Sequence, residues 1–267
     1  MDPIIKQNQD TRRLRSDEPG LPAYTSGAGS GSGTAPTGRG LNLQGTPFVG
    51  DLRIGSWNAQ ALLARHKAKR AAKWDQCWKL LKNCDILALQ ETHSTVANTT
   101  RATLSRTSQF WWSHETQHTG GVGIAASTTF LANFRKNTDG SVGEWIEVTP
   151  GRAAILRLEG PKGDMDIATI YMPTGSARRE RDAIRDSMAR HIRTADQALT
   201  ILVGDWNFVE QQTDRMGLTE AQWTMTPDTK EYAGWQRHIF TPFNMAEIWQ
   251  EDMTHHTKLG TSRLDRA

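Results

Sequence analysis

Several polar side chains follow short apolar stretches of this chain, and their residue types suit chemistry on a phosphate. They are Asn58, Glu91, Tyr171, Asp205, Asn207 and Asp265. A single carboxylate at the end of a strand is typical of an ordinary turn or cap. We therefore base the interpretation on the whole set and its order, because loops at strand ends are where rigid scaffolds mount reactive groups.

This set predicts hydrolysis of a phosphate ester. The transition state of that reaction carries charge on the phosphoryl oxygens, and it needs a hard cation, hydrogen-bond donors and a positioned water. Oxygen atoms of Glu91 and Asn58 are ligands that Mg²⁺ accepts, with water completing its octahedron. We expect Asn207 to donate to a non-bridging oxygen, Tyr171 to hold the phosphate, and Asp205 to orient or deprotonate the water.

Motifs of several other enzyme classes are absent from the sequence. No cluster of cysteine and histidine has the spacing of a zinc site. Neither a G-x-x-x-x-G-K-[ST] loop nor a G-x-S-x-G elbow occurs, which argues against nucleotide triphosphatases and serine hydrolases. The first apolar stretch is not followed by G-x-G-x-x-G, which argues against a Rossmann fold.

Short apolar strands and amphipathic helices must position these residues. Strands are predicted over residues 52–57, 85–90, 121–126, 145–148, 153–158, 167–171 and 199–203. Helices are predicted over 67–82, which places Trp74, Trp78 and Leu81 on one face, and over 177–192. Adjacent strands, with helices between others, predict a layered α/β or α+β domain whose helices cover packed sheets.

Composition limits the class of protein. The chain has 267 residues, of which 37% are hydrophobic and 23% charged, enough for one sizeable core. Its net charge of +3 is too small to indicate nucleic-acid binding by itself. No apolar run is long enough to span a membrane, and the two cysteines, Cys77 and Cys84, exclude a disulfide scaffold. We expect an intracellular protein.

Residues 1–48 are expected to form a disordered tail, and residues 49–267 are expected to form the folded domain. The tail is rich in Gly, Ser and Pro and contains few large apolar residues. Such a segment buries too little surface to offset the entropy of ordering it.

Six short motifs, in this order, resemble the endonuclease/exonuclease/phosphatase superfamily. They are Ile54-Gly-Ser-Trp-Asn58, Leu87-Ala-Leu-Gln-Glu-Thr-His93, Gly120-Gly-Val-Gly-Ile124, Ile170-Tyr-Met-Pro173, Gly204-Asp-Trp-Asn207 and Ser262-Arg-Leu-Asp265. The match runs from about Leu52 to the last residue. Within the superfamily, the motifs most resemble the endonuclease domains of LINE-type retrotransposons and the apurinic endonucleases.

The resemblance implies a DNase I-like fold, which is a four-layer α/β sandwich of two mixed β-sheets flanked by helices. It also implies Mg²⁺-dependent cleavage of a phosphodiester, with Mn²⁺ as a substitute, and DNA as a partner through its backbone. By this resemblance Glu91 is a metal ligand with Asn58 beside it, and Tyr171 contacts the scissile phosphate. Asp205 and Asn207 handle the attacking water and the developing charge. A retroelement origin implies a nuclear location.

The catalytic histidine of the family has no counterpart at the expected place. In the family, the aspartate that matches Asp265 supports this histidine, which a further strand and a Ser-Asp-His motif supply. The sequence stops at Ala267, so we expect a truncated copy without that strand and motif. His255 and His256 are expected on the neighbouring arm of a hairpin, as packing or surface residues. His93 has a counterpart in retroelement enzymes, and both a structural and a catalytic role stay open.

Arginines crowd the predicted helix that follows Tyr171. The two nearest to it, Arg178 and Arg179, are expected to contact a nucleic-acid backbone, because phosphate contacts are the main affinity term for DNA. Acidic residues neutralise part of the same helix, so a solvated helix is the alternative. Tryptophans are expected mainly in the core, while Trp111 and Trp112 stay open between core and surface.

Three functional hypotheses result. The first is a nicking DNA endonuclease of the retroelement type, whose activity as printed is in question because the terminal histidine is absent. The second is a phosphatase or phosphodiesterase that acts on a small phosphorylated substrate. The third is a catalytically dead fragment that binds nucleic acid.

Overall fold

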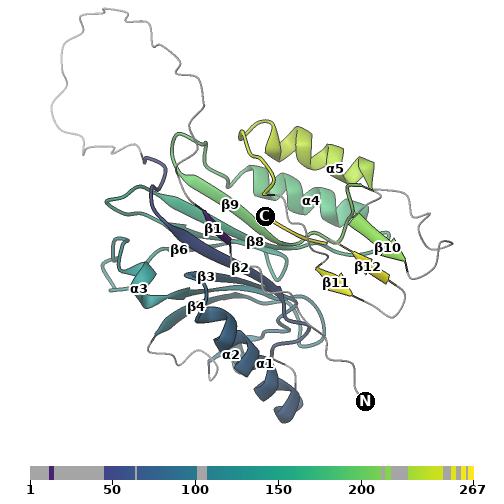
Figure 1. Cartoon of the computed structure of the whole chain (residues 1–267), viewed down its shortest axis with the longest axis horizontal. Helices are drawn as coiled ribbons and strands as arrows, with labels where there is room; N and C mark the ends of the chain where they lie inside the picture. Colours follow the sequence, from purple (N-terminus) through teal and green to yellow (C-terminus); the bar gives the residue numbers. More distant parts are fainter. Residues whose placement is uncertain are drawn as a thin grey trace, which may run out of the picture.

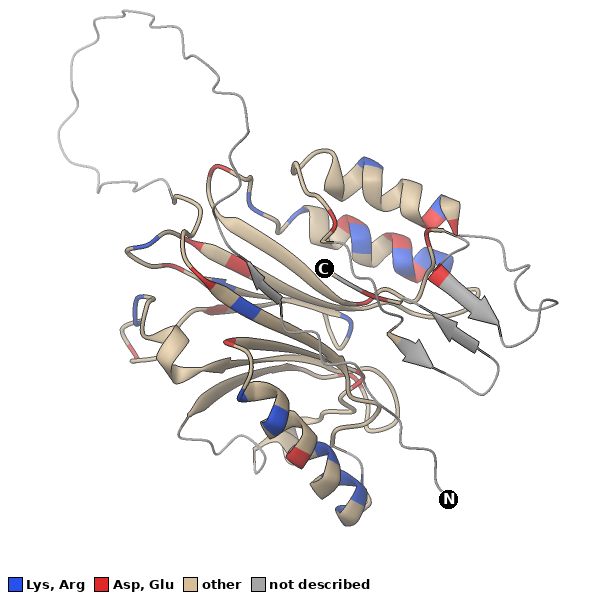
Figure 2. Cartoon of the chain, viewed as in Figure 1, with Lys and Arg blue, Asp and Glu red and all other residues tan. Residues whose placement is uncertain are grey.

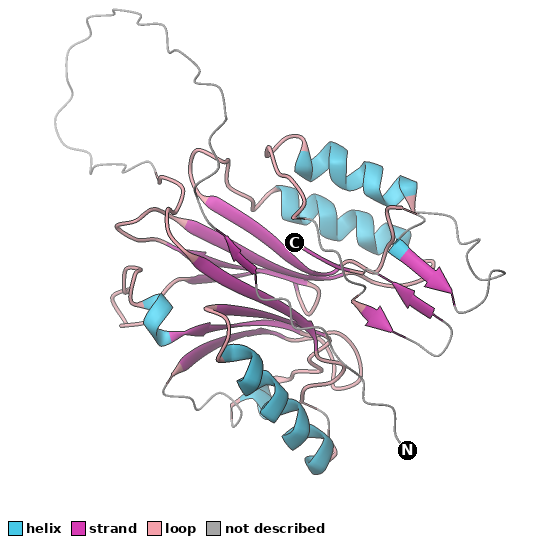
Figure 3. Ribbon diagram, in the orientation of Figure 1, coloured by secondary structure: helices cyan, strands magenta, loops and turns pink. Residues whose placement is uncertain are grey.

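The computed structural model describes residues 12–14, 45–63, 65–100, 107–211, 214–217, 228–248, 254–256, 260–262 and 264–267. In this part of the chain, two five-stranded sheets form the centre and helices lie outside them (Figure 1, Figure 3). A smaller sheet has the strand order β10-β12-β11 and joins Arg215–Gly217, Gly260–Ser262 and His255–His256.

The first sheet has the strand order β1-β2-β3-β5-β4. Its strands are β1 (Arg12–Leu14), β2 (Leu52–Asn58), β3 (Ile86–Gln90), β4 (Ser108–Ser113) and β5 (Val122–Ser127). β2 and β3 are parallel, and the other pairs are antiparallel. The carboxyl ends of β2 and β3 therefore lie side by side at the same end of this sheet.

The second sheet has the strand order β13-β9-β8-β7-β6. Its strands are β6 (Glu144–Thr149), β7 (Ala153–Leu158), β8 (Met165–Tyr171), β9 (Leu199–Asp205) and β13 (Asp265–Arg266). Only β8 and β9 are parallel among these described strands, so this sheet is mixed like the first one.

The strand β3 shows how the layers are built. Ile86 and Ala88 pack into the core between the two sheets, whereas Leu87 and Leu89 pack under α1 (Lys67–Leu81). A strand that is buried on both faces needs a continuous apolar run rather than an alternating one. The sequence Ile-Leu-Ala-Leu meets this requirement.

Helices cover the outer face of the second sheet as well. Ile184 and Met188 of α4 (Arg178–Ala189) and Trp235 of α5 (Thr229–Trp235) share a core cluster with Ile155 of β7. A π-helix, η3 (Gln236–Phe240), continues α5, while α2 (Val96–Thr99) and α3 (Thr128–Leu131) are short. The order helix, sheet, sheet, helix confirms the predicted four-layer fold. None of the described helices is long and apolar enough to cross a membrane.

The predicted strands and helices are found with boundaries shifted by at most three residues. Further elements were not predicted, namely β1, β4, β10, β13, α2, α3 and α5. Among them, β4 is a full strand of the first sheet. Both of its faces are covered. Trp111 packs against the core between the sheets, whereas the rings of Phe110 and Trp112 stack 5.7 Å apart and pack with the cluster under α1. The open question about Trp111 and Trp112 is thereby answered, since both side chains are half-buried.

Two stretches of the expected tail are described. Residues 12–14 form β1, which pairs with β2. Phe48 is buried, and its ring lies 5.6 Å from that of Phe134, while Pro47 forms a β-bridge with Asp164. The packed part of the chain therefore begins before residue 49, because Phe48 supplies apolar surface to the core. The rest of the expected tail, residues 1–11 and 15–44, lies outside the described residues.

Candidate active site

The candidate residues lie where parallel strands of both sheets end. Asn58 is the last residue of β2 and is in register with Gln90, the last residue of β3, so Glu91 follows directly beside it. Tyr171 ends β8 and is in register with Asp205, the last residue of β9. Each sheet thus presents two neighbouring strand ends.

A hydrogen bond joins the two sheets at this place. The Asn58 side chain donates from Nδ2 to Oδ2 of Asp205 over 2.7 Å. The other carboxylate oxygen, Oδ1, accepts a hydrogen bond from the backbone N–H of Asn207 at 3.0 Å. The Asn207 side chain in turn donates to the carbonyl of Met172 at 2.7 Å, which fixes the direction of its amide.

Asp265 reaches the same place from β13. It is in antiparallel register with Asp205, and its backbone N–H donates to the Thr254 hydroxyl at 3.1 Å. Thr254 lies next to the hairpin of β11 and β12, in which His255 pairs with Ser262. The hairpin that we expected around His255 and His256 is therefore confirmed at the backbone, and their side chains lie outside what is described.

The loops that follow β3 and β9 contain several residues in the left-handed conformation. Glu91, His93 and Asn207 have φ values of 51°, 53° and 51°. Residues other than glycine adopt such values at a cost of about 1–3 kcal/mol, and they persist only where the surroundings enforce them. Here Gly120 and Gly121 accept hydrogen bonds from the N–H groups of His93 and Thr92. The loop that carries Glu91 is therefore held rigidly.

Burial and mutual repulsion raise the pKa values of the carboxyl groups. Burial raises the pKa of Asp205 to about 6, and the charge of Glu91 adds to this, whereas the hydrogen bonds from Asn58 and Asn207 oppose it. Burial and then the charge of Asp205 raise the pKa of Asp265 to about 8. The carboxyl groups of Glu91, Asp205 and Asp265 therefore lie close enough to influence one another.

This cluster of carboxyl oxygens fits a hard divalent cation. Oδ1 of Asp265 is buried and has no hydrogen-bond partner within the described residues. No group of three or more His, Cys, Asp or Glu in that part of the chain is arranged to hold a metal by itself. A cation held by Glu91 with Asn58 beside it would therefore keep several water ligands, as Mg²⁺ prefers.

Arg152 is a site residue that the sequence did not indicate. Its guanidinium lies over the ring of Tyr171, 5.2 Å from the ring centroid. It forms ion pairs with Glu115, 3.3 Å from Nη2 to Oε1, and with Glu180, 3.4 Å from Nε to Oε1. Burial, together with the charges of Glu91 and Asp205, raises the pKa of Tyr171 to about 12, and Arg152 opposes this shift. The only local signal is an arginine between a turn glycine and the apolar run of β7.

Arg178 and Arg179 lie in the first turn of α4 and are exposed. Arg178 pairs with Asp182 at 3.8 Å. Glu180, the residue after Arg179, forms an ion pair with Arg152. Because Arg152 lies over the Tyr171 ring, this turn of α4 is near that ring. Among the described residues, neither arginine forms a hydrogen bond or an ion pair with Tyr171 or with the site carboxylates, which are those of Glu91, Asp205 and Asp265.

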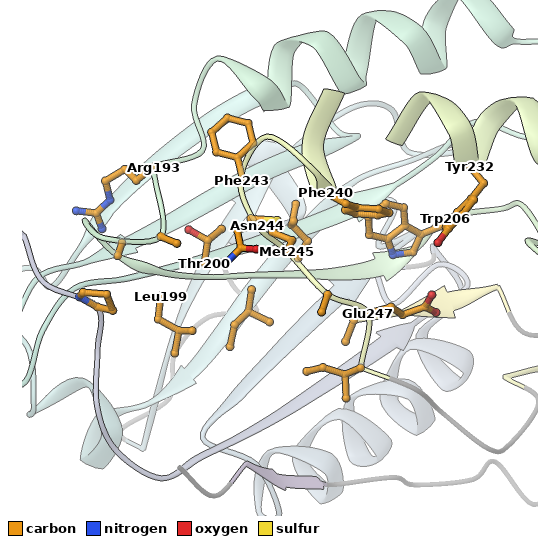
Figure 4. Close-up of a pocket in the computed structure, with 18 of the residues that line it drawn as sticks. Arg193, Leu199, Thr200, Trp206, Tyr232, Phe240, Phe243, Asn244, Met245 and Glu247 are labelled. Atoms are coloured by element: carbon orange, nitrogen blue, oxygen red, sulfur yellow. The ribbon is translucent and has the colours of Figure 1, made fainter. Parts of the chain in front are cut away.

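A separate cavity of about 390 Å³ lies against β9 (Figure 4). Trp206, between Asp205 and Asn207, lines this cavity with Phe240, Phe243 and Met245. Its lining is mostly apolar and includes none of the residues singled out for chemistry. Trp206 also packs in the cluster under α4 and α5, and this packing helps to fix the turn that carries Asp205 and Asn207.

Comparisons with known proteins agree with this fold. Residues 55–267 match the Endonuclease/Exonuclease/phosphatase family, and no curated protein matches the chain. An AP endonuclease from Leishmania major is similar with 17% identity and a TM-score of 0.52, over 79% of this chain and 76% of the other. A humanized D. rerio TDP2 with 14 mutations is similar with 17% identity and a TM-score of 0.51, over 79% and 80%.

A structure of D. rerio TDP2 complexed with a single-strand DNA product is also similar. It has 15% identity and a TM-score of 0.50, over 79% of this chain and 80% of the other. At these identities the likeness shows the fold.

Proposed function

Because this chain belongs to the endonuclease/exonuclease/phosphatase family, we propose that it is a Mg²⁺-dependent phosphodiester hydrolase that nicks DNA, of the retroelement type. The observation that carries the proposal is the hydrogen bond between Asn58 and Asp205, since it joins the candidate residues of the two sheets into one site. The DNA-bound TDP2 has the same fold, which supports a nucleic acid as the substrate.

Asp205 and Tyr171 would act directly on the reacting groups. With a pKa of about 6, Asp205 is largely ionised at neutral pH and can accept a proton from the attacking water. With a pKa of about 12, Tyr171 keeps its proton and can donate a hydrogen bond to a phosphate oxygen. The two side chains end neighbouring parallel strands, so one phosphate can reach both.

Asn207 and Asn58 complete the set. One N–H of the Asn207 amide donates to Met172, which leaves the second N–H for a non-bridging oxygen. Asn58 orients the Asp205 carboxylate. Mg²⁺, held by Glu91 with Asn58 beside it, would supply positive charge to the phosphoryl oxygens. Asp265 would form a further hydrogen bond through Oδ1, which is buried and has no partner among the described residues.

Relaxation of supercoiled plasmid tests the proposal. The 267-residue chain with Mg²⁺ is expected to convert supercoiled DNA into nicked circles, and EDTA is expected to stop the reaction. Glu91→Gln and Asp205→Asn are each expected to lower the rate by about 10²-fold or more. Asp139→Asn is the matched control, because this carboxylate lies in an exposed turn.

The outcomes are decisive in both directions. Absence of nicking with Mg²⁺ and Mn²⁺, or equal nicking by the Glu91 and Asp205 variants, would overturn the proposal. Turnover of an inositol phosphate without nicking of duplex DNA would assign the site to a small phosphorylated substrate. Retention on DNA at low salt without any cleavage would identify a binding protein only.

A further inference from the structure

The helix α1 carries positive charge that acidic neighbours do not balance. It contains five basic residues and one acidic residue, Asp75. Figure 2 shows more blue than red on this helix. Within the described part of the chain, the side chains of Lys67, Lys69 and Arg70 form no ion pair. These charges are therefore available to a partner.

The helix α4 differs in this respect, although it contains four arginines. Arg181 pairs with Glu231 at 3.1 Å, and Arg185 pairs with Asp182 at 2.6 Å and with Glu231 at 3.5 Å. Figure 2 shows blue and red mixed on this helix. Most of its charge thus serves the packing of α4 against α5.

The amino-terminal part of α1 lies beside the candidate site. Lys73 donates to the carbonyl of Ala59, the residue after Asn58, and the charge of Glu91 acts on Lys73. Arg65, just before the helix, donates from Nε to Oε1 of Gln117 at 2.7 Å. Lys73 therefore links this end of α1 to the loop that follows Asn58 and lies near Glu91.

We propose that Arg65, Lys69, Arg70 and Lys73, the basic end of α1, bind the phosphate backbone of duplex DNA beside the cleaved bond. The inference rests on the proposed function, because a phosphodiester at the site must continue into flanking phosphates. Lys69 and Arg70 lie four and three residues before Lys73, so these three share one flank of the helix. Arg65 and Lys69 are exposed, and Arg70 is half-buried.

The carboxyl-terminal end of α1 offers a matched control. Lys79 and Lys82 are also exposed, but Lys82 lies roughly 14 Å further along the helix axis than Lys73, at 1.5 Å per residue. Lys79 and Lys82 lie near the amino end of β3, which is the end away from the site. Lys73 lies near the carboxyl ends of β2 and β3, where it donates to Ala59. Removing two charges there changes the net charge equally without touching the basic end of α1.

Binding of a labelled DNA duplex, measured by fluorescence anisotropy in EDTA, tests the inference. Three double variants are compared: Lys69→Gln with Arg70→Gln, Lys79→Gln with Lys82→Gln, and Arg178→Gln with Arg179→Gln. Each phosphate contact contributes about 0.9 to the slope of log affinity against log salt. The first variant is expected to reduce this slope by about 2 and to weaken binding by about tenfold at 0.1 M salt. The second is expected to change neither.

Equal weakening by all three variants would overturn the inference, because it would show only long-range attraction. Weakening by the Arg178 and Arg179 variant alone would assign the contact to α4 and would also overturn it. Binding to phosphatidylserine vesicles without binding to DNA would identify a membrane surface instead. Circular dichroism and the melting temperature check that each variant folds.

This test is separate from that of the proposed function. Loss of binding at the basic end of α1, in a protein that never nicks DNA, would support the surface and contradict the hydrolase. Nicking by a wild-type protein whose binding does not depend on Lys69 and Arg70 would do the reverse.

Discussion

The side-chain amide of Asn58 donates a 2.7 Å hydrogen bond to the carboxylate of Asp205, 147 residues further along the chain. The bond connects the end of β2 in one sheet with the end of β9 in the other. Because Asp205 is buried, its carboxylate depends on this donor and on the N–H of Asn207 for its direction. The bond is therefore where the packing of the two sheets determines the geometry of the site.

Removal of this donor is expected to lower activity more than stability. Asn58→Ala is predicted to reduce the nicking rate by about 10²-fold, because it frees the Asp205 carboxylate to rotate. Initial rates on supercoiled plasmid measure this effect, and thermal melting checks the fold. Asn83→Ala, an exposed amide after α1, is the control and is expected to keep the wild-type rate. A rate unchanged in Asn58→Ala would contradict the role of the bond.

Arg152 is predicted to be a positioning residue that acts through Tyr171. Arg152→Met removes the cation above the ring, and we expect kcat to fall by about tenfold with a smaller change in KM. Arg152→Lys is expected to recover only part of this loss, because a guanidinium stacks on a ring and pairs with two carboxylates better than an ammonium does. Steady-state nicking of a short duplex separates kcat from KM.

Arg135→Met provides the comparison, since Arg135 is exposed and its side chain makes no contact with the site residues described. The prediction fails when Arg152→Met and Arg135→Met have the same kcat, or when Arg152→Lys is as impaired as Arg152→Met. The second result would show that a positive charge above the Tyr171 ring does not account for the loss of kcat.

Much of the fold could be predicted because its strands are buried on both faces. The stretches 86–89 and 201–203 consist of apolar residues only, and such runs bounded by turns indicate central strands. The strand β4 could not be predicted in this way. Its sequence Ser-Gln-Phe-Trp-Trp-Ser packs aromatic rings on both faces, so no alternation marks it as a strand.

The motifs indicate candidate residues for the site, but they do not indicate the hydrogen bonds between them. Each of Asn58, Glu91 and Asp205 follows an apolar strand, which local sequence reveals. The bond between Asn58 and Asp205 depends on how two sheets face each other. Arg152 was missed for the same reason, because its partners Tyr171, Glu115 and Glu180 come from three other segments.

Asp265 is predicted to make stability depend on pH in the absence of divalent metal. Its pKa in the folded protein is about 8, above its ordinary value of 3.8. An acid with a raised folded-state pKa contributes stability that is present below about pH 3.8 and is lost as the pH rises through 8. Asp265→Asn stays neutral, so in EDTA it is expected to melt above the wild type at pH 8.

The expected gain is a few degrees, since about 1 kcal/mol shifts the melting temperature of a domain of this size by roughly 2–4 °C. It is expected to disappear near pH 4, where the wild-type carboxyl group is also neutral. Melting curves across this range measure the difference. Asp139→Asn, in an exposed turn, is expected to give no gain at pH 8. A gain of Asp265→Asn that is equal at both pH values would contradict the assignment.

Gln90 is predicted to hold the two sheets together beneath the site. Its Nε2 donates to Thr169 Oγ1 of β8 at 3.1 Å, and its Oε1 accepts from Ser56 at 3.2 Å. Gln90 and Thr169 are fully buried. Gln90→Leu is expected to lower the free energy of unfolding by about 1–3 kcal/mol, because it leaves the buried Thr169 hydroxyl without a partner. Urea unfolding measures this loss.

Thr169→Val completes a double-mutant cycle. When both polar groups are replaced, no buried group is left unpaired, so the double variant is expected to lose less than the sum of the single variants. Ser56→Ala is the control, and a smaller loss is expected because Ser56 is exposed. Strict additivity would show that Gln90 and Thr169 do not couple. With coupling, nicking is expected to fall in Gln90→Leu as well, because Gln90 is in register with Asn58, which donates to Asp205.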